Sequence, residues 1–122
     1  MAKIEKSEAP SANEIKAFLN NISFSIPKEF VEFYEQSNGA EINSEKAYTV
    51  VLWPITEMIQ LNKDYEVETY APEFFIFGSD GGDTAFTIEK STGKIFEMPF
   101  IGMGKEEATF NASSFDEFLK SR

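Results

Sequence analysis

The side chains with the clearest chemical potential in this sequence are closely spaced carboxylates. Two pairs stand out, Glu66 with Glu68 and Asp80 with Asp83. Such a pair could supply the acid and the nucleophile of glycoside cleavage, but one carboxyl group would need an apolar pocket that keeps it protonated. Nothing near either pair marks a substrate cleft, so a small carboxylate hydrolase is the least favoured hypothesis.

The residue types that are missing exclude most other chemistry. The chain has no Cys and no His, and its only Arg is the last residue, Arg122. Without thiolates there are no thiol nucleophiles, zinc–cysteine sites or disulfides. Without imidazoles the usual general base near neutral pH and the commonest metal ligand are also missing. We therefore expect no catalytic residues, no metal and no cofactor.

The segment Ser79-Asp80-Gly81-Gly82-Asp83 is the sharpest local feature of the sequence. Glycines supply positive φ angles and Asp side chains stabilise turns, so a structural turn is the favoured interpretation. Contact with a partner's Lys or Arg is a second possibility. A bound cation is a third, although the spacing does not match the alternating acids of a calcium loop.

The balance of charge points to the kind of partner. The chain has 21 acidic and 11 basic residues, which gives a net charge of −10. This charge opposes binding to nucleic acid and to anionic membranes, and it favours association with a basic protein. The alternative is that the acidity only keeps the protein in solution.

More than half of the charge excess falls in one third of the chain, because residues 31–70 have a net charge of −6. This segment forms either a solvated face or a patch complementary to a basic partner. The candidate partner-binding residues are Glu41, Glu45, Glu66, Glu68, Asp80 and Asp83.

The pattern of apolar residues predicts an α+β fold. Ser11 and Glu14 form a capping box before a short amphipathic segment, and Pro27 suits the first position of the clearest helix. Asn38-Gly39 is expected to cap that helix, Phe74–Phe77 to form a central strand, and residues 64–73 an exposed acidic loop. The predicted helices are 11–20, 27–37, 55–63 and one beginning at Ser113 or Ser114; the strands are 48–52, 74–77, 85–88 and 94–98, with a possible fifth at 109–110.

The runs of neighbouring strands, without alternating helices, predict an antiparallel meander with N-terminal helices, one inserted helix and a C-terminal helix. A chain of 122 residues fits a single domain, which we place at 11–122 after a flexible lead-in at 1–10. Tyr48 and Trp53 are interpreted as core residues, with an interface role as the alternative. No secretory signal or membrane-spanning run is recognisable, so a cytoplasmic location is expected.

In order and spacing, these pieces resemble the SUKH superfamily of Smi/Knr-like domains. The resemblance covers about residues 12–120. It rests on Ile26-Pro27 with Phe30 and Tyr34, on Leu52-Trp53-Pro54-Ile55, on the block from Phe75 to Asp83 with Ala85-Phe86, on the Gly93 turn, and on Ser114-Phe115-Asp116-Glu117-Phe118-Leu119.

The resemblance implies a non-catalytic protein-binding domain. Bacterial members are typically immunity proteins that neutralise a cognate polymorphic or contact-dependent toxin, often a nuclease. Yeast members are cell-wall regulators with long extra regions that this chain lacks, so the immunity role is favoured and a regulatory scaffold is the alternative. The expected partner is a basic toxin domain, bound 1:1 by a monomer or weak homodimer.

Overall fold

The protein is an α+β domain built on one antiparallel sheet. The computed structural model describes residues 3–43 and 49–120. Within those residues the sheet has seven strands in the order β1-β2-β3-β4-β5-β6-β7, each antiparallel to its neighbours. The strands are β1 (Lys3–Lys6), β2 (Ala40–Asn43), β3 (Thr49–Leu52), β4 (Phe74–Ser79), β5 (Thr84–Glu89), β6 (Ile95–Pro99) and β7 (Thr109–Ala112). The predicted fold class and meander are confirmed.

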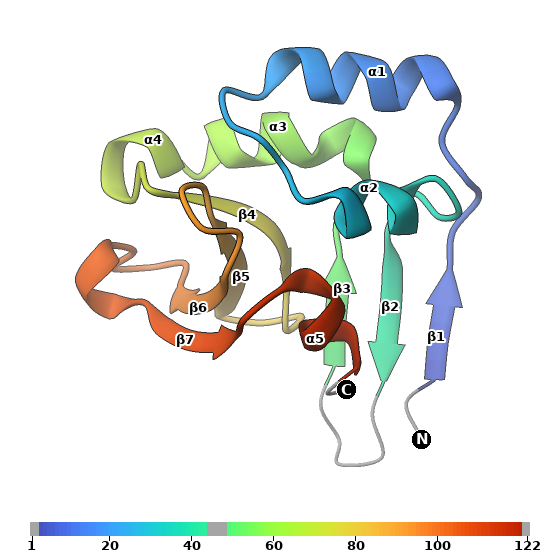
Figure 1. Cartoon of the computed structure of the whole chain (residues 1–122). Coiled ribbons are helices and arrows are strands. Elements are labelled where there is room, and N and C mark those ends of the chain that lie inside the picture. The colour runs from blue at the N-terminus through green and yellow to red at the C-terminus, as the bar shows by residue number, and fades with distance from the viewer. Residues whose placement is uncertain (1–2, 44–48, 121–122) are drawn as a thin grey trace.

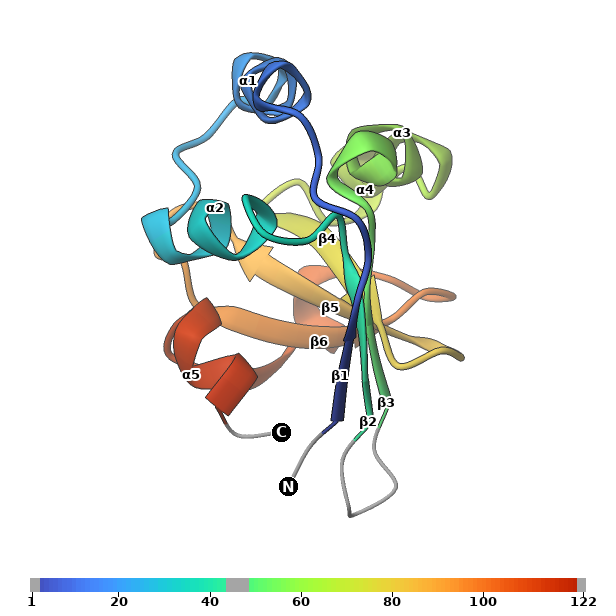
Figure 2. The same ribbon diagram turned by 90° about the vertical axis from the view of Figure 1, so that its right-hand side faces the viewer.

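Most of the helices lie in connections between neighbouring antiparallel strands (Figure 1). The pair α1 (Ala12–Asn21) and α2 (Lys28–Tyr34) separates β1 from β2, and the pair α3 (Ile55–Asp64) and α4 (Val67–Tyr70) separates β3 from β4. A single 3₁₀ turn, η1 (Lys105–Glu107), precedes β7, and α5 (Phe115–Lys120) follows it. In Figure 2, α2 and α5 lie on one side of the sheet, while α3 and α4 lie on the other side.

A cluster of aromatic side chains joins α2 and α5 to the sheet. Phe30, Phe77 and Phe115 contact each other edge to face, with ring centroids 4.9 to 6.1 Å apart. All three are fully buried. Aromatic pairs in this geometry add to the free energy gained from area burial alone. The spacing of Phe residues in the predicted helices therefore did mark the core.

Buried Asn62, on α3, takes the place of a neighbouring strand beside β4. The ladder between β3 and β4 includes only two residue pairs, Val51 with Ser79 and Leu52 with Gly78. Farther along β4, the Asn62 amide donates to the Ile76 carbonyl and accepts from the Ile76 N–H, both at 2.8 Å. One side chain thus satisfies both backbone groups of a buried strand residue. Leaving these groups without hydrogen bonds in the interior would cost free energy. This fixes α3, and with it α4, against the sheet.

Asn38 and Gly39 contact the start of α3 and the end of β3, and they do not cap α2. Helix α2 ends at Tyr34, short of the predicted 37. The Asn38 Oδ1 accepts from the Ile55 N–H at 2.7 Å, which satisfies a donor in the first turn of α3 where Pro54 offers no side-chain cap. Gly39 has φ +95°, and a Cβ there would lie 2.5 Å from the Leu52 carbonyl oxygen. The predicted C-cap is therefore wrong, although the backbone at residue 39 does require glycine.

Two further predictions need correction, and one strand was missed. The lead-in at 1–10 contains β1, whose residues Lys3 to Lys6 pair with β2. Strand β2 itself was not predicted. The exposed loop at 64–73 contains α4, and Val67 in that helix and Ala71 directly after it are buried. The other predicted helices and strands are confirmed to within a few residues, including the possible fifth strand, which is β7.

Candidate functional site

Asp80 and Asp83 lie in the exposed turn between β4 and β5, as predicted. The Asp80 carboxylate accepts from the Gly82 N–H at 2.8 Å and from the Thr84 N–H at 3.2 Å. Gly81 has φ +86°, and a Cβ added there would meet no atom within 4 Å. Asp80 therefore stabilises the turn. Within the described residues, the carboxylate of Asp83 on the same turn accepts no such bond from a backbone N–H.

Glu41 is exposed in the middle of β2, between Glu5 of β1 and Val51 of β3. Its neighbours along the strand, Ala40 and Ile42, are buried on the other face. Val51 is in turn paired with Ser79, the residue before Asp80. Glu41 and Asp80 are thus about two strand spacings apart, on the order of 10 Å. Glu45 and Tyr48 lie outside the described residues.

Glu66 and Glu68 flank the start of α4, at the other end of β4 from Asp80. Glu66 is the one non-glycine residue with positive φ in the part of the chain that the structure describes, at 58°. A left-handed backbone costs a residue with a Cβ roughly 1 kcal/mol. The Glu68 carboxylate pairs with the Lys90 ammonium, and the Glu68 side chain is 77% exposed. The predicted acidic residues therefore belong to separate elements: Glu41 to β2, Glu66 and Glu68 to the start of α4, and Asp80 and Asp83 to the β4–β5 turn.

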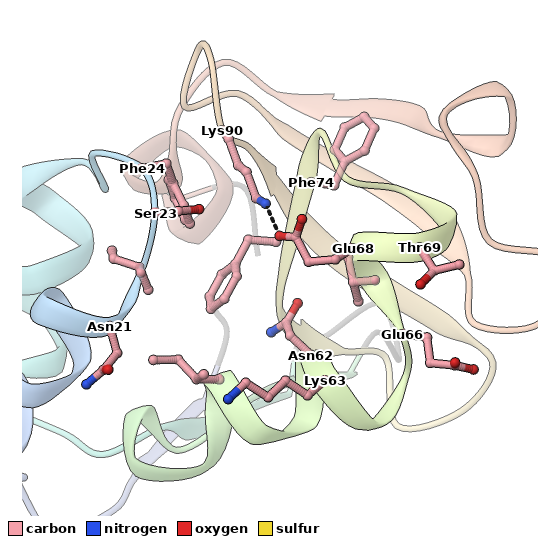
Figure 3. A pocket seen from close by; sticks show the side chains of 14 residues that line it. Asn21, Ser23, Phe24, Asn62, Lys63, Glu66, Glu68, Thr69, Phe74 and Lys90 are labelled. Atoms are coloured by element: carbon pink, nitrogen blue, oxygen red, sulfur yellow. Dashed lines mark hydrogen bonds and ion pairs between the residues drawn. The ribbon is translucent and has the colours of Figure 1, made fainter.

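A pocket of about 320 Å³ opens beside Glu68, between α3, α4, the segment before α2, and β4 (Figure 3). Its walls are mainly apolar, with Phe24, Val67 and Phe75 among the lining residues. Figure 3 shows Glu68 turned toward Lys90, while Glu66 extends away from that pair. The Lys90 ammonium also lies 5.8 Å from the centre of the Phe24 ring. Walls of this kind fit an apolar group and offer little for acid–base chemistry.

Neither predicted acid pair has the environment that glycoside cleavage requires. A general acid must be held protonated in an apolar setting. Glu68 instead faces solvent beside a cation, and Asp80 accepts two backbone N–H groups. Across residues 3–43 and 49–120, no group of three or more Asp and Glu side chains is placed to hold a metal ion.

Sequence reasoning missed a partly exposed aromatic cluster on the side of the sheet away from α2 and α5. The rings of Trp53, Tyr65 and Phe100 contact one another, with centroids 4.6 to 6.2 Å apart. Trp53 is buried, as predicted, but Tyr65 is 43% exposed. Phe100 was not singled out because it follows β6 in a segment with no periodic pattern. Its N–H donates to the Asp83 carbonyl at 2.9 Å, which joins the cluster to the acidic turn.

Comparison with known proteins identifies the family. The model of the SMI1 / KNR4 family (SUKH-1) matches residues 9–121, nearly the whole chain. A search of curated proteins gives no match. No helix in the described part of the chain is long and apolar enough to cross a membrane. Members of this family generally act as immunity or regulatory proteins rather than as enzymes. The aligned segment contains all five helices and six of the seven strands described above, so the chain belongs to the SMI1/KNR4 (SUKH-1) family.

Proposed function

We propose that this protein is an immunity-type protein that binds a basic toxin domain and blocks its active site. Membership of the SUKH family carries the proposal, because that family is consistent with immunity-type and regulatory roles. The binding is non-catalytic and takes place in the cytoplasm of the cell that makes the protein. A nuclease is the favoured toxin, since an acidic surface can mimic the phosphates that such an enzyme recognises.

The distribution of acidic side chains supports this proposal. Glu41, Glu66, Asp80 and Asp83 are all exposed. None of these four forms an ion pair with a lysine among the described residues. Glu68 differs, because Lys90 neutralises it. Exposed acids that are not neutralised in this way remain available to attract a basic partner and to accelerate its association.

A regulatory scaffold is the second candidate, and one observation favours it. The family model that matches nearly the whole sequence is consistent with a regulator-like role as well as with an immunity-type role. A scaffold would also bind a protein partner through an exposed face, but the partner's presence would not stop growth.

Affinity capture with the full chain tests the proposal. We expect a basic protein to be retained at about 50 mM salt and released as the salt concentration rises toward about 500 mM, because exposed charges are then screened. Retention of acidic proteins only, or of no protein, would contradict both forms of the proposal.

A further inference from the structure

The exposed part of the aromatic cluster and the segment after β6 form one continuous surface. The Phe100 ring packs on Tyr65, with centroids 4.6 Å apart, and the Phe100 N–H bonds the Asp83 carbonyl. Met103 is buried, and a Cβ placed on Gly104 would lie 3.8 Å from the Tyr70 carbonyl oxygen. The segment after β6 therefore lies between the β4–β5 turn and α4. In Figure 2 this segment and that turn both project on the side away from α2 and α5.

This surface leaves large apolar groups exposed to water. Ile101 is 91% exposed, directly after Phe100, and Tyr70 is also exposed. Single exposed apolar residues are ordinary, but several around a pair of contacting aromatic rings are typical of interface centres. We name Tyr65, Phe100 and Ile101 the aromatic surface.

The charges around the aromatic surface are nearly all negative. The segments 64–66, 80–83 and 100–107 have Lys105 as their only basic residue. Their acidic residues, all exposed, are Asp64, Glu66, Asp80, Asp83, Glu106 and Glu107. An apolar centre with an acidic rim is complementary to a surface where Arg or Lys side chains surround an apolar residue. A second copy of this chain would be repelled, because the protein has a net charge of −10.

We infer that the aromatic surface and its acidic rim are where the basic protein partner docks. This inference rests on the proposed function, and it adds the binding face and the recognition chemistry. Guanidinium groups stack on the exposed faces of Tyr65 and Phe100 and pair with Asp83 or Glu66 at the rim. Ile101 fills an apolar recess of the partner. The left-handed backbone of Glu66 directs the chain away from α3 at the edge of this surface.

NMR titration of the isotope-labelled full chain with defined peptides tests the surface. The probe is a short synthetic peptide in which arginines alternate with glycines around one central tryptophan. Its control has glutamate in place of every arginine. We expect the arginine peptide to shift the amide signals of residues 64–66, 80–83 and 100–107, and the glutamate peptide to shift none of them.

Four variants separate this surface from non-specific attraction. Ile101→Ser removes a central apolar contact and Asp83→Lys reverses a rim charge, and each should weaken binding of the arginine peptide by about tenfold. The matched controls, Leu19→Ser on α1 and Glu32→Lys on α2, should change it by less than about twofold. Both controls replace exposed residues, so folding is preserved.

The outcomes distinguish the surface from the proposed function. Shifts centred elsewhere, for example around Glu41 on β2, would overturn the surface while leaving the proposed function intact. So would equal weakening by all four variants, or an absence of shifts with both peptides. Failure of the proposed function shows separately, as the absence of a basic protein in the capture experiment.

Discussion

At the scale of single residues, two buried polar side chains connect the helices to the sheet. Asn62 bonds both backbone groups of Ile76 in β4. The Tyr34 hydroxyl, fully buried on α2, donates to the Trp53 carbonyl at 2.7 Å. Both bonds reach backbone groups at places where strand pairing stops, next to the short β3–β4 ladder. They therefore fix the positions of α2 and α3 more specifically than apolar packing alone would do.

Replacing Asn62 by Ala should destabilise the protein strongly. The change leaves the Ile76 N–H and carbonyl without partners in a buried site, which costs about 2–4 kcal/mol in free energy of unfolding. Gln60→Ala is the matched control, since Gln60 lies on the same helix and its side chain donates to the exposed Asp64 carboxylate. Urea denaturation would measure both. A loss below about 1 kcal/mol for Asn62→Ala would contradict the bridging role.

Tyr34→Phe should lower stability by about 1–2 kcal/mol near neutral pH, because the Trp53 carbonyl loses its partner. Burial raises the pKa of the Tyr34 hydroxyl far above its ordinary value. The unfolded state therefore releases the Tyr34 proton above about pH 10, while the folded state retains it. The wild type must then lose stability with rising pH in that range, and Tyr34→Phe lacks this contribution.

Denaturation at several pH values checks the sign of this effect. The stability difference between wild type and Tyr34→Phe should be constant at neutral pH and shrink above about pH 10. A difference that stays constant above about pH 10 would show that the Tyr34 hydroxyl ionises as readily in the folded state as in the unfolded state.

At the scale of elements, close approach between segments fixes where the chain must turn. Gly39 lies against the backbone of β3 at the point where β2 begins, and it has a positive φ. Gly81 has a similar φ but has open space around it. Substitution of Gly81 would therefore show the cost of backbone strain alone. Substitution of Gly39 would show the cost of strain together with that of a steric clash.

Gly39→Ala should be far more damaging than Gly81→Ala. A Cβ at residue 39 would lie 2.5 Å from the Leu52 carbonyl oxygen, so β2 and β3 would have to separate. We expect a loss of more than about 3 kcal/mol at residue 39 and of about 1–2 kcal/mol at residue 81. Thermal unfolding measures both, and equal losses would refute the close approach at Gly39.

Sequence patterns predicted the elements that carry a clear periodic signal. The capping box at Ser11 and Glu14 forms as predicted, and the apolar run at Phe74 forms the central strand. Strands β1 and β2 were missed because each is four residues long with few apolar positions, and pairing with a neighbour stabilises them. Helix α4 is too short to show a helical repeat of apolar residues in the sequence, and its formation depends on the burial of Val67 against the rest of the protein.

The candidate site was predictable only in part. Composition indicated an acidic binding surface, and the Asp80 turn was located correctly from its glycines. Which acids lie together depends on folding, and the structure places Glu68 beside Lys90 although the two are 22 residues apart. The aromatic surface brings together the residue after α3 and the segment after β6, which are far apart in the sequence, so no local pattern could reveal it.

At the scale of the whole molecule, net charge governs how a partner is found. The charge of −10 acts at a distance, while the aromatic surface acts on contact. Charge reversal at Asp83 should therefore slow association and reduce its salt dependence, whereas Ile101→Ser should mainly speed dissociation. Stopped-flow or surface-based kinetics with the captured partner would resolve the two rates. An effect of Asp83→Lys on dissociation alone would argue against electrostatic attraction over distance.

Growth of cells that produce the captured basic protein tests the central claim most directly. If this chain is an immunity-type protein, that basic protein arrests growth by itself, and co-production of the wild-type chain restores it. Ile101→Ser should restore growth poorly, while Leu19→Ser should restore it fully. A captured partner that leaves growth unaffected, or a growth arrest that the wild-type chain does not relieve, would contradict the immunity role.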